Sequence, residues 1–196
     1  MAINRLTQSS VQGGLPKFDS VWDGVSAVGS MEPISAITLT GTQTTVEFNN
    51  IPSTYSHLHL RAIARDTGSS YGYNISLRFN SDSTSSYTRH NLEGNGTSVS
   101  ASGSSSAESS IPLATTTGGA NGTNVFSVFV SDIVDYTNTN KNTTVRALTG
   151  YDDINSGYVN FRSGAFLKTD AITTITLLST GTAFAINSSF SLYGIK

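Results

Sequence analysis

The sequence contains no cysteine, few charged residues and no long hydrophobic run. Without cysteine the chain can form no disulfide bond, thiolate nucleophile or thiolate metal site. Only 12% of the residues are charged and the formal net charge is −2, so no basic field is present to bind a nucleic acid or an anionic membrane. No stretch approaches the roughly 20 apolar residues that a membrane-spanning helix needs. We therefore expect neither a nucleic acid nor a membrane as a partner.

The chain of 196 residues suits one domain, alone or with an arm, and it can bury a core without disulfides. Its first ten residues, MAINRLTQSS, lack the apolar segment of a secretory signal peptide. We therefore expect synthesis in a cytoplasm without export by that route. Serine, threonine, asparagine and glycine replace most of the usual surface charges, a composition that favours strands and turns over helices.

Short stretches of alternating apolar and polar residues follow one another from Ile34 onward. In HLHLRAIAR (57–65), Leu58 and Leu60 fall on one face, whereas Ile63 breaks the alternation. No segment of ten residues carries a helical stripe. We expect the first two strands to form a hairpin around Gly41. The expected strands are 36–40, 44–48, 57–65, 73–79, 86–92, 124–130, 143–150, 157–168, 171–178 and 190–195.

This pattern predicts an all-β protein. Eight or more short alternating strands form either two antiparallel sheets packed face to face or a barrel, and a jelly-roll-like antiparallel β-sandwich is our first choice. Alternation also disfavours a parallel sheet, whose strands are apolar throughout. We place the sandwich at 34–196 and an irregular N-terminal arm at 1–33.

The arm has no sustained period, yet it carries too many large apolar side chains for a solvated tail. It either packs on its own domain or docks onto a partner, and the sequence leaves both readings open. The candidate partner-binding residues are Leu6, Val11, Leu15, Phe18, Val21 and Trp22.

A polar stretch lies in the middle of the fold. Residues 94–123 consist mostly of glycine, serine, threonine and alanine, and Val99, Ile111 and Leu113 are the exceptions. We predict a long loop without structure of its own, either disordered or ordered by a neighbouring copy or a receptor.

Candidates for catalysis or metal binding are few. His57 and His59 lie two residues apart, so both rings point to the same side of a strand and could hold a metal, although a surface pair is the more common case. Asp152 and Asp153 could bind calcium, but two such residues are more typical of a turn, which we favour.

Asp132 and Asp135 likewise read as strand-end and loop residues rather than as an acid pair. The carboxylates Glu32, Glu47 and Glu108 lack the apolar surroundings that tune a glycosidase acid. No nucleophile elbow, phosphate loop or dinucleotide fingerprint is present. We expect no enzyme activity, no cofactor and no metal.

Tyrosines are the remaining candidates for ligand binding. Several of the eight lie beside loops, where a ring can cover a sugar face while asparagine and aspartate bind its hydroxyls. Ordinary packing with the hydroxyl at the rim is the alternative that we favour. The eight are Tyr55, Tyr71, Tyr73, Tyr87, Tyr136, Tyr151, Tyr158 and Tyr193.

Three segments resemble a module of tailed-bacteriophage virion proteins, notably of marine and cyanobacterial phages. They are TTVEFNNIPSTYSHLHLRAIAR, NISLRFNSDSTSSYTRHNLEGNGT and AITTITLLSTGTAFAINSSFSLYGIK, and the likeness covers about residues 36–196. The resemblance implies a jelly-roll sandwich on a capsid decoration, tail fibre or tail tip, and it brings no catalytic residues.

From this resemblance we expect a non-enzymatic virion structural protein, assembled in the host cytoplasm. Our first expectation is a capsid decoration (cement) protein or short head fibre, homotrimeric and docked on other virion proteins through its arm. The alternative is a tail-fibre or tail-tip component that binds a host surface glycan or receptor.

Overall fold

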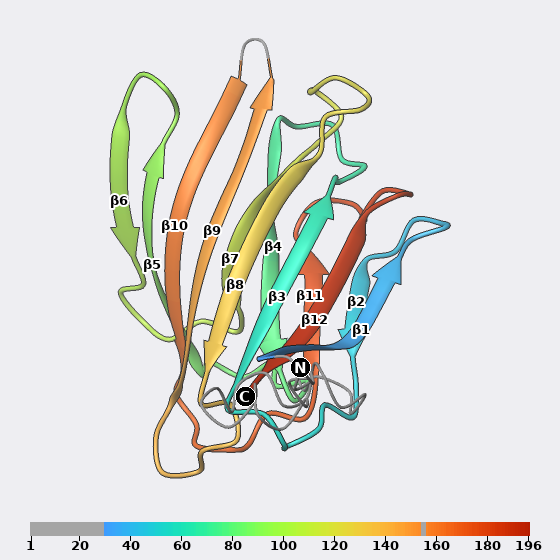
Figure 1. Cartoon of the computed structure of the whole chain (residues 1–196). Coiled ribbons are helices and arrows are strands. Elements are labelled where there is room, and N and C mark those ends of the chain that lie inside the picture. Colours follow the sequence, from blue (N-terminus) through green and yellow to red (C-terminus); the bar gives the residue numbers. More distant parts are fainter. Residues whose placement is uncertain (1–29, 154–155) are drawn as a thin grey trace, which may run out of the picture.

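The computed structural model describes residues 30–153 and 156–196, and this part of the chain forms twelve strands and no helix (Figure 1). The larger sheet has the order β1-β12-β3-β8-β9-β10-β5-β6, and the smaller has the order β2-β11-β4-β7. The strands of the larger sheet are β1 (Met31–Thr38), β3 (His57–Ala64), β5 (Tyr87–Gly94), β6 (Val99–Gly103), β8 (Ser127–Val134), β9 (Thr143–Asp153), β10 (Ser156–Phe166) and β12 (Ser189–Ile195). Those of the smaller sheet are β2 (Thr45–Phe48), β4 (Gly72–Phe79), β7 (Ile111–Thr117) and β11 (Ile175–Ser179).

Eight of the twelve strands form a jelly roll. β1 pairs with β12, β2 with β11, β3 with β8 and β4 with β7, and every pair is antiparallel. This is the pairing of one long hairpin, rolled up so that successive pairs lie alternately in the larger and the smaller sheet. The prediction of an all-β, jelly-roll-like antiparallel sandwich is therefore confirmed.

Two inserted hairpins widen only one of the sheets. β5 and β6 come between β4 and β7 in the chain, and β9 and β10 come between β8 and β11. All four join the larger sheet beyond β8, so this sheet extends past the smaller one (Figure 1). We call these four strands the extension. Its inner side contacts β7, and its outer side belongs to the outer face of the larger sheet.

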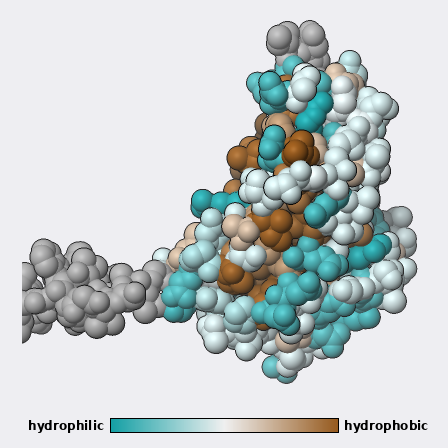
Figure 2. All heavy atoms as spheres, turned by 90° about the vertical axis from the view of Figure 1, so that its right-hand side faces the viewer, coloured by the Kyte–Doolittle hydropathy of each residue, from teal (hydrophilic) through white to brown (hydrophobic). Residues whose placement is uncertain are grey.

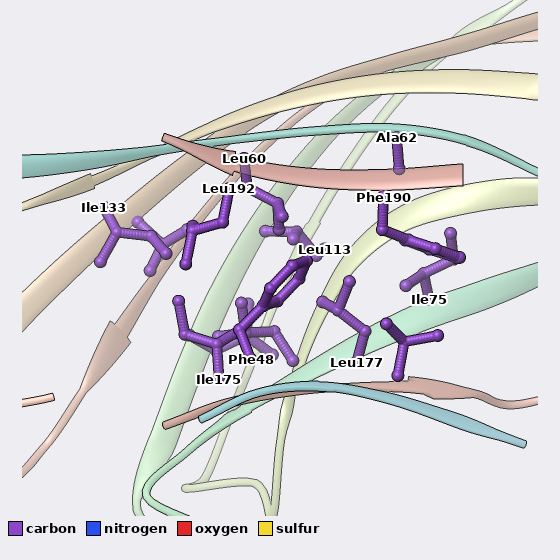
Figure 3. Packing of buried hydrophobic residues seen from close by; sticks show 14 of the residues in the cluster. Phe48, Leu60, Ala62, Ile75, Leu113, Ile133, Ile175, Leu177, Phe190 and Leu192 are labelled. Carbon is purple, nitrogen blue, oxygen red and sulfur yellow. The ribbon is translucent and has the colours of Figure 1, made fainter. Parts of the chain in front are cut away.

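The core lies between the two sheets and follows from the alternation of the strands. From the larger sheet, Leu60 and Leu192 point inward, and from the smaller sheet Ile175 and Leu177 point toward them (Figure 3). Each of these side chains is fully buried, and burying one such residue contributes about 1.5–3 kcal/mol. Ile63, which breaks the alternation of β3, points outward and is half exposed.

The predicted hairpin around Gly41 is wrong. The chain crosses from one sheet to the other after β1, so β1 pairs with β12 while β2 pairs with β11. Leu39 is buried in this crossing, and its backbone forms hydrogen bonds with Asn187 and Ser188. Alternation predicts that a strand exists, but it does not identify the neighbouring strand.

The predicted structureless loop at 94–123 is also wrong. It contains β6 and β7, and Ile111 is buried in β7. Thr116 and Thr117 are buried beside it, and their hydroxyls donate hydrogen bonds to the carbonyls of Ala64 and Val125. A strand of small residues is stable here because its hydroxyls are satisfied and a neighbouring sheet covers it. The loop prediction rests on the lack of large apolar side chains in 94–123, and a strand covered in this way does not need them.

The first described strand of the sandwich starts before residue 34. β1 begins at Met31, and Met31, Glu32 and Pro33 pair with the last residues of β12. The candidate arm residues Leu6, Val11, Leu15, Phe18, Val21 and Trp22 lie outside the described residues. Their docking on a partner stays a prediction.

Candidate functional site

The extension enlarges one surface of the jelly roll and creates another. One is the outer face of the larger sheet, and the other is a cleft where the inner side of the extension meets β4 and β7. Both are built from side chains that the strand register brings together from distant parts of the sequence. The two surfaces differ in chemistry, because the outer face is apolar and the cleft is polar.

Two rows of cross-strand neighbours make the outer face apolar. The first row runs Ile63, Val128, Gly150, Val159, Gly94, Val99, and the second runs Arg61, Val130, Leu148, Phe161, Leu92, Ala101. The eight large apolar side chains in these rows are 36–76% exposed. Figure 2 shows hydrophobic residues gathered in a band with polar residues around it. Contiguous exposed apolar patches mark interaction surfaces in soluble proteins.

The apolar rows have relief as well as hydrophobicity. Gly150 and Gly94 flank Val159 in the first row and leave a hollow of about 650 Å³. Leu148 and Phe161 lie beside it in the second row, which contains no glycine between β8 and β5. The outer face therefore offers a hollow and a ridge side by side.

A line of hydrogen-bonded polar groups borders the apolar rows. His59 Nδ1 lies 2.7 Å from Asp132 Oδ1, and Arg61 Nε donates to His59 Nε2 at 3.0 Å. Arg146 Nε donates to the second oxygen of Asp132 at 3.0 Å. Burial raises the pKa of Asp132, but the bonds from His59 and Arg146 outweigh it, and the net shift is downward. Asp132 pairs with Arg146 and contacts His59, whereas the charge of Arg61 is bonded to a ring nitrogen and not to a carboxylate.

The structure places the predicted histidine pair on one side of β3, as expected, but not in a metal site. His57 contacts Asp135, whereas His59 contacts Asp132, so each ring has its own carboxylate. Within residues 30–153 and 156–196, no group of three or more histidine, aspartate or glutamate side chains is placed to hold a metal ion. In the same ranges, no helix is long and apolar enough to cross a membrane.

The predicted turn at the two adjacent aspartates is an extended strand end. Both Asp152 and Asp153 belong to β9, where they pair with Gly157 and Ser156 of β10. Asp153 accepts hydrogen bonds from the side chain of Asn121 and from the backbone of Gly122. It therefore fastens the loop after β7 to the β9–β10 hairpin.

The cleft is lined by aromatic rings and by hydrogen-bonding side chains, and its volume is about 400 Å³. Tyr151 and Tyr158 lie side by side on β9 and β10, with ring centroids 5.6 Å apart. Tyr71 stands just before β4, and its side chain is more than half exposed. The other lining residues are Gly72, Tyr73, Asn74, Glu93, Thr115, Arg162 and Thr180.

Arg162 is the central polar group of the cleft. It points inward from β10 and is only 6% exposed. Its guanidinium donates to Asn91 through Nε at 3.2 Å, to Asn74 through Nη1 at 2.9 Å and to Thr115 through Nη2 at 2.8 Å. None of the ion pairs among the described residues includes it. Burial lowers the pKa of Arg162 to about 10, and Glu93 opposes that shift, so the group stays charged at neutral pH.

The loop between β3 and β4, which carries Tyr71, is fixed by hydrogen bonds to the buried Asp66 and by one bond to the hydroxyl of Tyr73. Asp66 is fully buried and accepts hydrogen bonds from the backbone of Gly68 at 2.6 Å and of Thr182 at 3.0 Å. The hydroxyl of Tyr73 accepts a bond from Ser70 N at 3.0 Å, and the bonds from Ser70 lower the pKa of Tyr73. Tyr71 therefore stands on an anchored loop.

The tyrosines divide between the two roles that the sequence left open. Tyr87 and Tyr136 are fully buried and serve packing, as favoured. Tyr71, Tyr73, Tyr151 and Tyr158 gather in the cleft. Sequence reasoning missed Arg162 and Glu93 entirely, because strand pairing, not local sequence, brings them to the tyrosines.

A comparison with protein-family models, curated proteins and solved structures finds no match for this chain.

Proposed function

We propose that this chain is a non-enzymatic structural protein of a bacteriophage virion, a capsid decoration (cement) protein or short head fibre. The apolar outer face of the larger sheet supports this proposal more than any other observation. A protein that works alone in solution gains nothing from eight exposed apolar side chains in two adjoining rows. A protein that is packed beside neighbours on a particle covers such a face.

We further propose that a second copy of this chain covers the outer face. In a two-fold contact each residue meets the same patch on the partner, so a patch with unbalanced charge would repel itself. Arg61 is the only charged residue in the two rows and lies at their β3 end, while Asp152 and Asp153 line the hollow beside Gly150. A two-fold axis between the rows would set the ridge at Phe161 and Leu148 against the hollow at Gly150 of the partner. The sequence-based expectation of a trimer stays a prediction.

The association is tested with the full chain by light scattering over a range of concentrations. We expect oligomers that become monomers in Leu148→Glu and in Phe161→Glu, because a buried unpaired charge opposes association. Ile186→Glu is the matched control, since Ile186 is half exposed but lies outside the rows. A full chain that is monomeric at every concentration, or variants that associate normally, would contradict self-association through this face.

The place in the virion is tested by quantifying the chain in purified particles by mass spectrometry. A copy number comparable with that of the major shell protein supports a decoration protein, and a small number per particle supports a tail component. Absence from purified particles would overturn the virion proposal. Docking through the arm residues is tested by adding the chain without residues 1–29 to undecorated shells, which it should fail to bind.

The alternative, a tail component that binds a host surface glycan, needs a saccharide site on the chain. The tyrosine-lined cleft is the observation that favours it.

A further inference from the structure

We propose that the cleft between the extension and the smaller sheet binds a neutral saccharide. The site consists of the tyrosines around Tyr71 and of the polar group centred on Arg162. Its volume of about 400 Å³ falls within the usual size of small-ligand pockets. This proposal does not rest on assembly through the outer face, although Tyr151 and Tyr158 line both the cleft and the hollow of that face.

The aromatic rings supply apolar faces at the mouth of the cleft. Tyr71 is 58% exposed, so a ligand in the cleft can contact its ring from solvent. Its loop is anchored through Asp66 and Tyr73, so little entropy is lost when the ring is covered. Tyr158 lies against Tyr151 on the opposite wall. A pyranose ring presents a face of C–H groups that packs well on such side chains.

The polar residues supply donors and acceptors in fixed positions. Asn91 links Arg162 to Glu93. Its amide oxygen accepts a hydrogen bond from Arg162 Nε at 3.2 Å, and its amide nitrogen donates one to Glu93 Oε2 at 3.3 Å. A cationic donor and an anionic acceptor are thus held together in one cleft. Thr115 and Thr180 add hydroxyls. Adjacent hydroxyls of a sugar both donate and accept, which matches this mixed set better than it matches a ligand of one polarity.

The charge balance favours a neutral saccharide over an acidic one. Among the described residues that line the cleft, only Arg162 and Glu93 are charged, and their charges cancel. The carboxylates of Asp152 and Asp153 lie on the same hairpin as Tyr151 and Tyr158. A sialic acid or uronic acid would therefore meet a site without net positive charge, whereas anion sites carry an excess of basic groups or backbone N–H donors.

The test uses the full chain on a printed array of neutral glucose, galactose and mannose oligosaccharides beside sialylated and uronate-containing ones. The neutral oligosaccharide with the strongest signal is then titrated by calorimetry. Tyr71→Ala and Glu93→Gln should each raise its Kd about tenfold, through loss of one ring contact and of one charge-assisted hydrogen bond. Tyr193→Ala is the matched control, since Tyr193 lies on the outer face beside Arg61, and its Kd should stay unchanged.

Three results would overturn the proposal. They are preferential binding of the acidic oligosaccharides, a Kd that neither cleft variant changes, and no neutral ligand on the array for a chain whose circular dichroism shows the β fold. Light scattering of the same variants separates this proposal from assembly, because Tyr71→Ala and Glu93→Gln should associate as the original chain does. Failure of sugar binding would leave the outer-face proposal standing, and failure of association would leave the cleft proposal standing.

Discussion

The ring of Tyr55 lies directly on Gly194. A Cβ atom added to Gly194 would lie 2.3 Å from Cγ of Tyr55, closer than any carbon contact allows. The two residues are 139 positions apart in the sequence, in the stretches IPSTY and LYGI. The hydroxyl of Tyr55 donates a hydrogen bond to Glu32 Oε2 at 3.1 Å, so β1 is linked to the same ring. Tyr55 and Gly194 therefore help to hold the sheet together.

Gly194→Ala should destabilise the fold by about 1–3 kcal/mol, because the added methyl must displace a packed ring. Urea denaturation measures the loss. The double variant Tyr55→Ala/Gly194→Ala should show a smaller penalty for the glycine change, since the ring is gone. Tyr55→Phe/Gly194→Ala should show the full penalty, because the ring remains. Equal penalties in all three backgrounds would mean that the ring is not what excludes a side chain at position 194.

Tyr87, the first residue of β5, also has a structural role. The hydroxyl of Tyr87 accepts from Phe79 N at 3.0 Å and donates to the carbonyl of Asp82 at 3.0 Å, all within the turn after β4. Its ring stacks on Phe166 with centroids 5.0 Å apart. Tyr87→Phe keeps the stack and leaves buried polar backbone groups unsatisfied, so we expect a loss of about 1–3 kcal/mol by urea denaturation.

Tyr71→Phe is the matched control for this change, because its hydroxyl stands on an exposed side chain. It should leave the urea midpoint unchanged. A midpoint for Tyr87→Phe that equals that of the original chain would show that the turn does not depend on the hydroxyl.

Asp82 makes the stability depend on pH. The ammonium of Lys168, 2.6 Å away, and the donors of Thr84 hold the pKa of Asp82 well below its usual range. A carboxylate whose pKa is depressed by folding stabilises the native state above its unfolded pKa, about 3.9, and that contribution is lost as the pH falls toward the folded pKa. The pKa values of Glu32, Asp132 and Asp135 are also lowered, so they act in the same direction.

We therefore expect Asp82→Asn to have a lower urea midpoint than the original chain at pH 6. At pH 2.5 the difference between the two midpoints should be smaller. Asp170→Asn, a change at an exposed carboxylate, should leave the midpoint unaltered at both values. A gap of equal size at pH 6 and pH 2.5 would show that the charge of Asp82 does not stabilise the fold.

The sequence predicts the strands and the sandwich well and the functional surfaces poorly, and β10 shows why. In YVNFR, the apolar residues Val159 and Phe161 alternate with Asn160 and Arg162, which reads as a strand with its apolar side toward the core. The structure has the reverse orientation, with Val159 and Phe161 outside and Asn160 and Arg162 buried. Periodicity gives the two sides of a strand, but only the strand order tells which side is covered. The extension that decides this is not visible in local sequence.

The boundary of the N-terminal arm leads to a last prediction, for two truncated chains. Removal of residues 1–29 leaves all of β1, whereas removal of 1–33 deletes three residues that pair with β12. It also deletes Glu32, which accepts hydrogen bonds from Tyr55 at 3.1 Å and from Lys196 at 2.6 Å. The chain without 1–33 should therefore unfold at a lower temperature than the chain without 1–29, by circular dichroism at pH 7.

The variant Glu32→Gln in the chain without 1–29 separates the two causes. It keeps the backbone pairing of β1 and weakens the contact with Lys196, so its midpoint should fall between those of the two truncated chains. Equal midpoints for the two truncated chains would mean that the pairing of residues 31–33 with β12 adds nothing to stability. In that case the boundary of the sandwich would lie after Pro33 rather than at Met31, and Tyr55 would be held in place by Gly194 alone.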